Sequence, residues 1–254
     1  MKRAIVRQPG PEMAEGERSF LEREPIDFQL ALAQHEAYCQ ALRDLGCEPL
    51  VLPALAGFPD APFVEDMAVV LPEVAVLTRT GAESRRLEQA SVQAALADFR
   101  DFVRIEEPST LDGGDVFLAG ETLFVGQSRR TNHAGLKQLA HLVLPYGVRV
   151  KAVGVTDALH LRTGCSWLGG DHLLINRAWI DAERLAEYPL IEVHPDEAFA
   201  GTALVIGETV LMTAAAPLTI ERVRAAGYEV RALDISEFEK AEAGLTCLSI
   251  VFEA

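Results

Sequence analysis

The stretch Asp115–Val153, DVFLAGETLFVGQSRRTNHAGLKQLAHLVLPYGVRVKAV, contains the unit that decides the fold. Two short segments, Asp115–Leu118 and Thr122–Val125, are rich in β-branched and aromatic residues, which predicts a pair of strands. The apolar positions of Thr131–Leu144 predict a helix, and Val148–Val153 returns to a strand pattern. One supersecondary unit with the order strand–strand–helix–strand is therefore expected here.

The same order recurs along the rest of the chain. The other strands are expected at Ala4–Arg7, Glu48–Leu52, Met67–Leu71, Val74–Thr78, Phe102–Ile105, Ser166–Leu168, His172–Ile175, Ala203–Ile206, Thr209–Met212, Glu229–Ala232 and Leu248–Phe252, with helices at Asp27–Leu45, Ser84–Phe99, Asp181–Tyr188 and Leu218–Ala226. A unit repeated about five times, every ~40–50 residues, predicts a propeller or pseudo-symmetric array rather than a doubly wound sheet. No linker divides the pattern, so residues 1–254 are expected to form a single domain.

Composition limits the partners that the protein is expected to have. The chain has 254 residues, 49% of them hydrophobic, and a formal net charge of -15. Nucleic acids and anionic membranes demand a basic surface, so neither is an expected partner. No apolar run is long enough for a transmembrane helix, and Arg7, Pro9, Pro11 and Glu12 interrupt any signal-peptide core. A cytoplasmic location is expected, and a cationic small substrate is compatible with the charge.

The chain contains four cysteines, Cys39, Cys47, Cys165 and Cys247. They form no CxxC motif and show no regular spacing, so neither a metal site nor a disulfide framework is expected. Cys39 and Cys47 are most simply explained as small core residues, because buried cysteine is common.

Four polar segments interrupt the apolar pattern at predicted strand ends, where functional residues gather. They are Phe63–Asp66, Leu111–Asp115, Leu159–Thr163 and Gly244–Ser249. Each has a structural explanation when taken alone. Acidic pairs at strand ends are usually solvated, Asp-Gly-Gly sequences form ordinary turns, and isolated cysteines are often buried. His160 lies between two leucines, so strand alternation puts it on the opposite face, as for a hydrogen-bonded structural histidine.

Together the segments indicate nucleophilic chemistry. Cysteine becomes a nucleophile only beside a base or a positive field, which His160 can supply to Cys247. A carboxylate such as Asp112 can hold the imidazole in the required tautomer. The remaining acids, Glu65, Asp66 and Asp60, would then serve to neutralise a cation.

These segments, in this order, resemble the dimethylarginine dimethylaminohydrolase family of the guanidine-modifying, or pentein, superfamily. The resemblance spans nearly the whole chain. It rests on Phe58–Asp60, Phe63–Asp66, Thr78–Arg79, Gly81–Arg86, Leu111–Val116, Arg130–Asn132, Leu159–Thr163 and Gly244–Ser249. It implies an α/β fold, namely a five-bladed pseudo-symmetric α/β propeller of ββαβ units. It also implies hydrolysis of an Nω-methylated arginine to citrulline and methylamine or dimethylamine, without a cofactor or metal.

The resemblance implies a role for each site residue. Cys247 attacks the guanidinium carbon, His160 protonates the departing amine and then activates water, and Asp112 orients His160. Substrate binding is implied for Asp66, Glu65, Asp60, Arg85, Arg130 and the backbone of Ala241. The partner implied is a small cationic guanidino amino acid, and a homodimer is compatible with the sequence.

Two positions depart from the family pattern. Asp112 stands where some members have glutamate. The loop Gln8–Glu24 matches poorly, although the family uses this region as a lid, and Arg18 falls where an apolar contact is expected. The preference for N-methyl groups is therefore less firmly implied than the hydrolase chemistry.

Three alternatives remain open at this stage. Arginine deiminases use the same nucleophile, but they usually carry a helical insertion for which this chain has no room. Agmatine deiminases and amidinotransferases are longer, and agmatine would leave Arg85 and Arg130 without a carboxylate to bind. A non-catalytic binding protein on the same propeller is the third alternative, against which the joint presence of Cys247, His160 and Asp112 argues.

Overall fold

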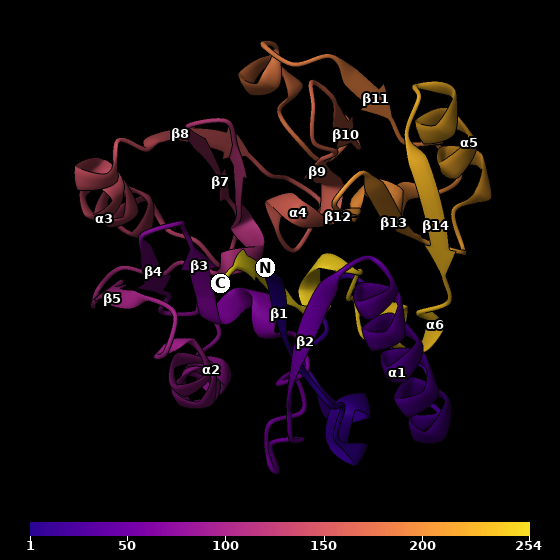
Figure 1. The fold of residues 1–254 in the computed structure, drawn as a ribbon, viewed down its shortest axis with the longest axis horizontal. Coiled ribbons are helices and arrows are strands. Elements are labelled where there is room, and N and C mark those ends of the chain that lie inside the picture. The colour runs from indigo at the N-terminus through magenta and orange to yellow at the C-terminus, as the bar shows by residue number, and fades with distance from the viewer.

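Fifteen strands of the computed structural model, which describes residues 1–254, pair into five three-stranded sheets. In order across each sheet they are β15 (Ile250–Glu253), β1 (Lys2–Arg7) and β2 (Cys47–Leu52); β3 (Ala68–Val70), β4 (Val74–Leu77) and β5 (Asp101–Arg104); β6 (Val116–Ala119), β7 (Thr122–Gln127) and β8 (Arg149–Gly154); β9 (Cys165–Trp167), β10 (Leu173–Ile175) and β11 (Leu190–Glu192); and β12 (Leu204–Ile206), β13 (Thr209–Thr213) and β14 (Glu229–Leu233). In every sheet the middle strand pairs antiparallel with the first strand and parallel with the third. The sheets stand as blades around a common centre (Figure 1), which confirms the predicted five-bladed α/β propeller.

The apolar core lies between the blades, because each middle strand is buried on both faces. In β7, Leu123 and Val125 pack towards the second blade, whereas Phe124 packs towards the fourth. In β13, Val210 and Met212 face the fourth blade, and Leu211 faces the first. Successive side chains of a strand point to opposite faces, so one apolar strand joins two neighbouring cores. Continuous apolar runs at the middle strands follow from this arrangement.

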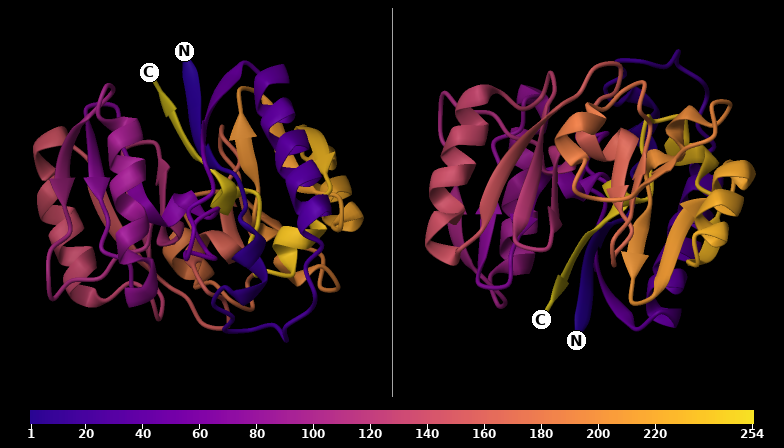
Figure 2. Two further views of the ribbon diagram at one scale, coloured as in Figure 1. Left: turned by 90° about the horizontal axis from the view of Figure 1, so that it is seen from below. Right: turned by 90° about the horizontal axis from the view of Figure 1, so that it is seen from above.

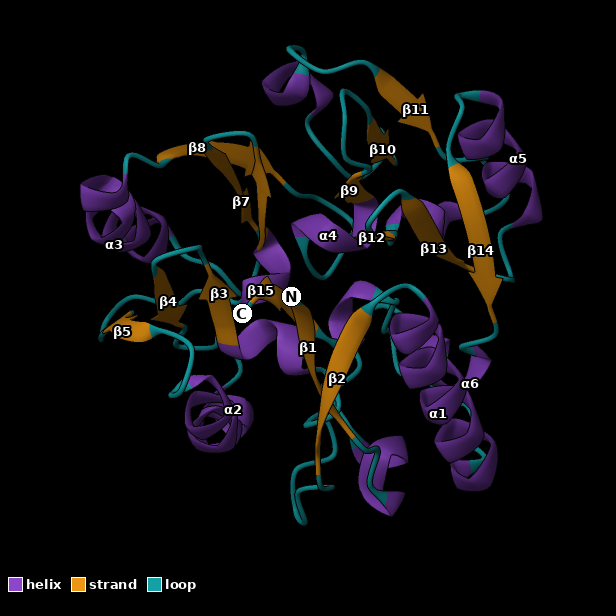
Figure 3. Ribbon diagram, in the orientation of Figure 1, coloured by secondary structure: helices purple, strands orange, loops and turns teal.

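The longer helices cover the outer side of the ring, whereas the one-turn helix Leu161–Gly164 lies near its centre (Figure 3). The α-helices are α1 (Phe28–Asp44), α2 (Gln89–Leu96), α3 (His133–Val143), α4 (Leu161–Gly164), α5 (Pro217–Ala225) and α6 (Ser236–Glu239). The helix predicted at Asp181–Tyr188 is reduced to a 3₁₀ turn, Ala182–Leu185, so the fourth blade has no full crossover helix. No helix of the chain combines the length and apolar character needed to cross a membrane.

The two ends of the chain close the ring. The first strand, β1, pairs antiparallel with the last, β15, from Lys2 opposite Glu253 to Ile5 opposite Ile250. Both views in Figure 2 show these two strands side by side. The first blade is therefore assembled from both termini, which places the segment before β15, including Cys247, at the centre of the ring.

A one-turn helix precedes the first strand of every blade. These turns are Val64–Met67, Gly113–Asp115, Leu161–Gly164, Ala198–Gly201 and Thr246–Leu248. Val64–Met67 contacts Gly113–Asp115 and Thr246–Leu248, and Leu161–Gly164 contacts Gly113–Asp115 and Ala198–Gly201, so the turns form an inner ring. Each of the four polar segments found in the sequence contributes one of these turns, and the repeat of the fold brings them together.

Candidate active site

Cys247 lines a cavity of about 380 Å³ at the inner ring. The other lining residues are Glu17, Asp60, Phe63, Asp66, Arg85, Arg130, Leu159, His160, Ala241, Glu242 and Ala243. Of the site residues predicted from the sequence, only Asp112 and Glu65 are not part of this lining.

The turn Thr246–Leu248 positions Cys247, whose backbone N–H donates to the carbonyl of Gly244 over 3.2 Å. A β-carbon at Gly244 would lie 2.4 Å from the hydroxyl of Thr202, so only glycine lets this segment pack there. The Cys247 side chain is half-buried and accessible from the cavity. The other three cysteines are buried, as predicted for Cys39 and Cys47.

A buried histidine–carboxylate pair lies beside Cys247. The His160 Nε2 atom is 3.0 Å from Oδ2 of Asp112 and 3.8 Å from Oδ1 of Asp66. The other Asp112 oxygen accepts a 2.7 Å hydrogen bond from the backbone N–H of Gly81. A carboxylate held at both oxygens fixes the position of the imidazole that it contacts. Asp112, although shorter than glutamate, therefore reaches His160.

The local structure around His160 corrects the predicted strand alternation. His160 is the N-cap residue of the helical turn α4, and strand β9 begins only at Cys165. Asp115, which the sequence did not single out, braces this turn by accepting a 2.9 Å hydrogen bond from the N–H of Leu161. Its second oxygen accepts from the hydroxyls of Ser128 and Thr131, both at 2.6 Å. The Asp-Gly-Gly-Asp segment thus supplies one carboxylate to the imidazole and another to its backbone.

His160 is charged at neutral pH. Burial by itself lowers the pKa of His160, but the carboxylates of Asp66, Asp112 and Asp115 outweigh it and raise the pKa to about 9. Burial raises the pKa of the Asp115 carboxyl to about 6, although His160 and the hydroxyls of Ser128 and Thr131 act in the opposite direction. His160 therefore begins as a proton donor in the free protein.

Cys247 is protonated in the free protein. Burial raises the pKa of its thiol to about 12, and the negative charges of Glu65 and Asp66 act in the same direction. A thiol with this pKa is a poor nucleophile near neutral pH. A cation bound against the thiol would lower its pKa by opposite-charge attraction.

Asp66 is presented to the cavity by Arg85. An Arg85 Nη1 donates to Asp66 Oδ2 over 2.5 Å, and Oδ1 accepts from the backbone N–H of Gly114 over 3.0 Å. Although burial works in the opposite direction, His160 and Arg85 lower the pKa of Asp66, which stays ionised. Arg85 also donates to Glu88 and to the carbonyls of Asp60 and Phe63. Most Arg85 donors are therefore committed within the protein.

Glu65 does not line the cavity of Cys247, although its charge acts on the thiol. It is buried, forms an ion pair with Arg162, and lines a separate cavity between the first strands of the blades. Burial raises the pKa of Glu65 even though Arg162 opposes this effect. Arg162 was not singled out from the sequence, because only the closed ring places it against Glu65.

The mouth of the cavity is covered by the loop that precedes α1. Asp60, Arg130 and Ala241 lie here together with Glu17 and Glu242, neither of which the sequence analysis selected. Arg18 does not line the cavity; its guanidinium donates to the carbonyls of Lys240, Glu17 and Met13. The Arg18 guanidinium is therefore hydrogen-bonded to backbone carbonyl oxygens and does not reach the cavity.

One group of side chains has the spacing of a metal site. One ligand atom each from Asp66, Asp112 and His160 lies within 4.8 Å of the other two. Asp112 is already bonded to His160 and Gly81, and Asp66 to Arg85 and Gly114, so a metal would have to compete with an existing network. The arrangement suits proton transfer directly.

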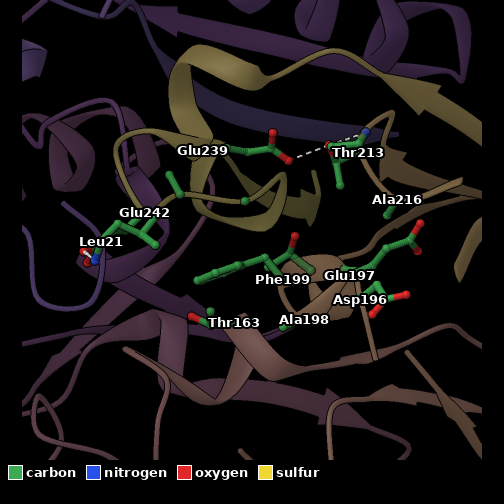
Figure 4. A pocket seen from close by; sticks show the side chains of 15 residues that line it. Leu21, Thr163, Asp196, Glu197, Ala198, Phe199, Thr213, Ala216, Glu239 and Glu242 are labelled. Atoms are coloured by element: carbon green, nitrogen blue, oxygen red, sulfur yellow. Dashed lines mark hydrogen bonds between the residues drawn. The ribbon is translucent and has the colours of Figure 1, made fainter. Parts of the chain in front are cut away.

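The largest cavities of the protein lie outside this cluster. One of about 760 Å³ adjoins it, sharing Glu242 and Ala243 as a wall (Figure 4). Its remaining lining includes Leu21, Phe199 and Glu239, but no cysteine or histidine. The chemistry therefore points to the smaller cavity as the candidate active site.

Five ββαβ blades with a thiol, an imidazole and carboxylates at the inner ring are the features of the pentein class. Comparison with known proteins agrees at the level of the family. The family model described as N,N dimethylarginine dimethylhydrolase, eukaryotic, matches residues 14–183. A dimethylarginine dimethylaminohydrolase of Streptomyces coelicolor is 43% identical over 98% of this chain and 96% of its own. The enzyme of that name from Pseudomonas aeruginosa is 33% identical over 99% of both chains.

Solved structures give the same result. The Pseudomonas aeruginosa protein, as a cysteine-to-serine variant in complex with citrulline, superposes with a TM-score of 0.93 at 32% identity over 98% of each chain. The N-terminal domain of ArgZ, an arginine dihydrolase, shares the fold at a TM-score of 0.87 but is only 21% identical. The chain belongs to the dimethylarginine dimethylaminohydrolase family.

Proposed function

We propose that residues 1–254 form one catalytic unit that hydrolyses Nω-methylated arginine to citrulline and methylamine or dimethylamine. The observation that carries the proposal is the cavity that joins Cys247 to the His160–Asp112 pair and to Asp66. The family relatives named as dimethylarginine dimethylaminohydrolases support it, as does the citrulline complex of one of them. The net charge of -15 favours a free cationic amino acid as partner, in the cytoplasm, over a nucleic acid.

When the substrate binds, the Cys247 thiol releases its proton to the solvent, and in the first half-reaction the resulting thiolate forms a bond to the central guanidinium carbon. The carbon–nitrogen bond to the methylated nitrogen breaks, and this nitrogen takes a proton from His160 and leaves as the amine. An S-alkylthiouronium remains on Cys247. The pKa of about 9 supports this role, because His160 holds the proton that the amine requires.

In the second half-reaction, neutral His160 accepts a proton from water as the water oxygen bonds to the same carbon. The carbon–sulfur bond breaks and the departing sulfur takes the second proton of the water, which releases citrulline and restores the Cys247 thiol and protonated His160. Asp112 keeps the imidazole in place through both steps, supported by its second hydrogen bond to Gly81.

Substrate-assisted ionisation follows from the charges. Guanidinium is a resonance-stabilised cation, so its site needs carboxylates rather than an oxyanion hole. Asp66 supplies one in contact with the cavity, and Glu65, which is buried outside the cavity lining, adds negative potential. These charges keep the thiol protonated until the positive substrate arrives, and the substrate then favours the thiolate.

The amino-acid end of the substrate is assigned to the mouth of the cavity. Arg130 suits the α-carboxylate, since guanidinium binds carboxylates in a bidentate manner, and Asp60 suits the α-ammonium group. Arg85 contributes chiefly by holding Asp66, with its remaining donor capacity available to the substrate. The backbone of Ala241 completes the lining on the side of α6.

The proposal is tested by assaying citrulline from asymmetric dimethylarginine, monomethylarginine, arginine and agmatine. We expect methylarginines to be turned over with the highest kcat/KM. Cys247→Ser should lower kcat on the order of 10³-fold or more, as for loss of a nucleophile. Cys39→Ala, which alters a buried cysteine that does not line the cavity, is the matched control and should retain activity. No citrulline from any of the four substrates would refute the proposal; a preference for arginine would replace it with deimination.

A further inference from the structure

The loop between β1 and α1 places one acidic side chain inside the candidate active site. Glu17 lines the cavity together with Cys247, Asp60 and Arg130. It follows the 3₁₀ turn Pro11–Glu15, and its side chain is about half exposed. Glu17 is therefore a residue of the loop between β1 and α1 (the cover of the cavity), and its side chain reaches the interior of the site.

Glu17 contacts both Arg130 and Asp60, the two groups assigned to the amino-acid end of the substrate. Its carboxylate pairs with Nη2 of Arg130 over 3.2 Å and accepts a 2.6 Å hydrogen bond from the hydroxyl of Ser84. Its backbone N–H donates to Oδ2 of Asp60 over 3.0 Å. One residue thus presents an N–H to a carboxylate and a carboxylate to a guanidinium, from inside the same cavity.

The amino-acid end of a substrate would need these same groups. An α-ammonium requires an anion and an α-carboxylate requires a cation, and both must be accessible from the cavity that contains the thiol. Arg130 is the arginine available for this purpose, because Arg85 is committed to Asp66, Glu88 and two carbonyls. Asp60 also lines this cavity, and its carboxylate is hydrogen-bonded to the backbone N–H of Glu17 rather than to Arg85 or His160.

We propose that Glu17 is a specificity-determining residue that takes the place of the substrate's amino-acid end, so that an α-amino acid must displace it from Arg130 and Asp60. The inference rests on the proposed function, because it assigns those two residues to the substrate. Glu17 thereby sets the affinity for α-amino acids without contacting the reacting carbon.

The local backbone is built for this contact. A β-carbon on Gly16 would lie 2.2 Å from Oδ1 of Asp60, so glycine at this position lets the N–H of Glu17 approach the carboxylate. Ion pairs with one partner exposed are weak, so a substrate can displace the Glu17 carboxylate.

The rest of the cover is anchored independently of Glu17. The Glu242 carboxylate accepts hydrogen bonds from the backbone N–H groups of Ser19, Phe20 and Leu21, at 2.7 to 3.0 Å. Figure 4 shows Glu242 beside Leu21. Glu242 itself has a φ of 60°, a left-handed conformation that is uncommon outside glycine and aims its side chain at the loop. Withdrawal of Glu17 therefore needs only a local movement, with residues 19–21 as the fixed end.

The test measures ligand binding by calorimetry in a Cys247→Ser background, where no turnover occurs. The probes are L-citrulline, which carries an α-carboxylate, and agmatine, which does not. Glu17→Gln should tighten citrulline binding about 2- to 5-fold, the range expected when a partly exposed ion pair ceases to compete. Agmatine binding should stay unchanged or weaken, because its complex leaves Glu17 on Arg130.

Glu15→Gln is the matched control, since Glu15 is exposed on the same loop and contacts neither Arg130 nor Asp60. It should change neither affinity. Unchanged or weaker citrulline binding in Glu17→Gln would overturn the proposal, as would an equal gain for citrulline and agmatine, which would indicate general loosening of the loop. Failure of the proposed function would look different, because citrulline would then bind none of the variants.

Discussion

In the free protein Cys247 is a protonated thiol and His160 is a protonated imidazole. This is the reverse of a pair in which a thiolate faces a neutral imidazole. Burial and two carboxylates raise the pKa of the thiol to about 12, and three carboxylates raise that of the imidazole to about 9 against the effect of burial. Both groups therefore carry their protons at neutral pH. A nucleophile of this kind is inert towards adventitious electrophiles and is activated only when a cation enters the cavity.

At the residue scale, we expect the pKa of Cys247 to depend on the ligand. A titration of thiolate ultraviolet absorbance, with Cys247→Ser as the blank, should show no ionisation of Cys247 up to about pH 9 in the free enzyme. Bound agmatine should move the ionisation to lower pH, because its positive charge stabilises the thiolate. The same titration curve with and without agmatine would contradict substrate-assisted ionisation.

At the scale of elements, α1 shows how sequence directs a local structure. Asp27 is its N-cap, and its Oδ1 accepts hydrogen bonds from the N–H groups of Gln29 and Leu30 at 2.9 and 3.0 Å. These bonds satisfy two of the donors that a helix leaves free at its first turn. The helix predicted at Asp27–Leu45 accordingly begins at Phe28, directly after its N-cap Asp27.

Removal of this cap should destabilise the protein measurably. Asp27→Ala should lower the free energy of unfolding by about 1 kcal/mol and the melting temperature by roughly 2–4 °C for a chain of this size. Differential scanning calorimetry provides the measurement. Glu24→Ala, a substitution at an exposed residue just before the helix, should leave the melting temperature unchanged. Equal melting temperatures for the two variants would show that packing alone defines the start of α1.

The middle strands were the most predictable elements. Val74–Leu77 and Thr209–Thr213 lie between two apolar cores, so their runs of β-branched and aliphatic residues give a clear strand signal. The one-turn helices before the first strands gave no such signal, since a single turn is too short to show a period. His160 was accordingly expected on a strand, although it caps α4. The strand β11 (Leu190–Glu192) was missed for the same reason of length.

Parts of the site depend on the closed ring and could not be predicted from local sequence. The polar segments and the family resemblance pointed to Cys247, His160 and Asp112, and the structure gathers them at the inner ring. The ion pairs Glu17–Arg130 and Glu65–Arg162 join residues about a hundred positions apart, on an exposed loop and across the centre. Nothing in the local pattern around Glu17 or Arg162 distinguishes them from solvated charges.

At the scale of the whole molecule, pseudo-symmetry explains how the site arises. Each blade places one short turn at the inner ring, and three of these turns carry Asp66, Asp115 and Cys247, while Asp112 and His160 cap two of them. Closure of the ring by β1 and β15 brings the last of these turns beside the others. The five-fold repeat therefore supplies equivalent positions, and the sequence fills them with different chemistry.

The central claim is that Cys247 forms a covalent intermediate with the guanidino carbon, and intact-mass spectrometry tests it most directly. His160→Gly is mixed with S-methyl-L-thiocitrulline, from which methanethiolate leaves without a proton from His160; a solved dimethylarginine dimethylaminohydrolase structure contains a histidine-to-glycine variant as an adduct with this compound. We predict an adduct with the mass of the ligand less methanethiol, located on the peptide that contains Cys247 and absent from the His160→Gly/Cys247→Ser double variant. An adduct on another residue, or citrulline formed with no adduct at Cys247, would contradict the account.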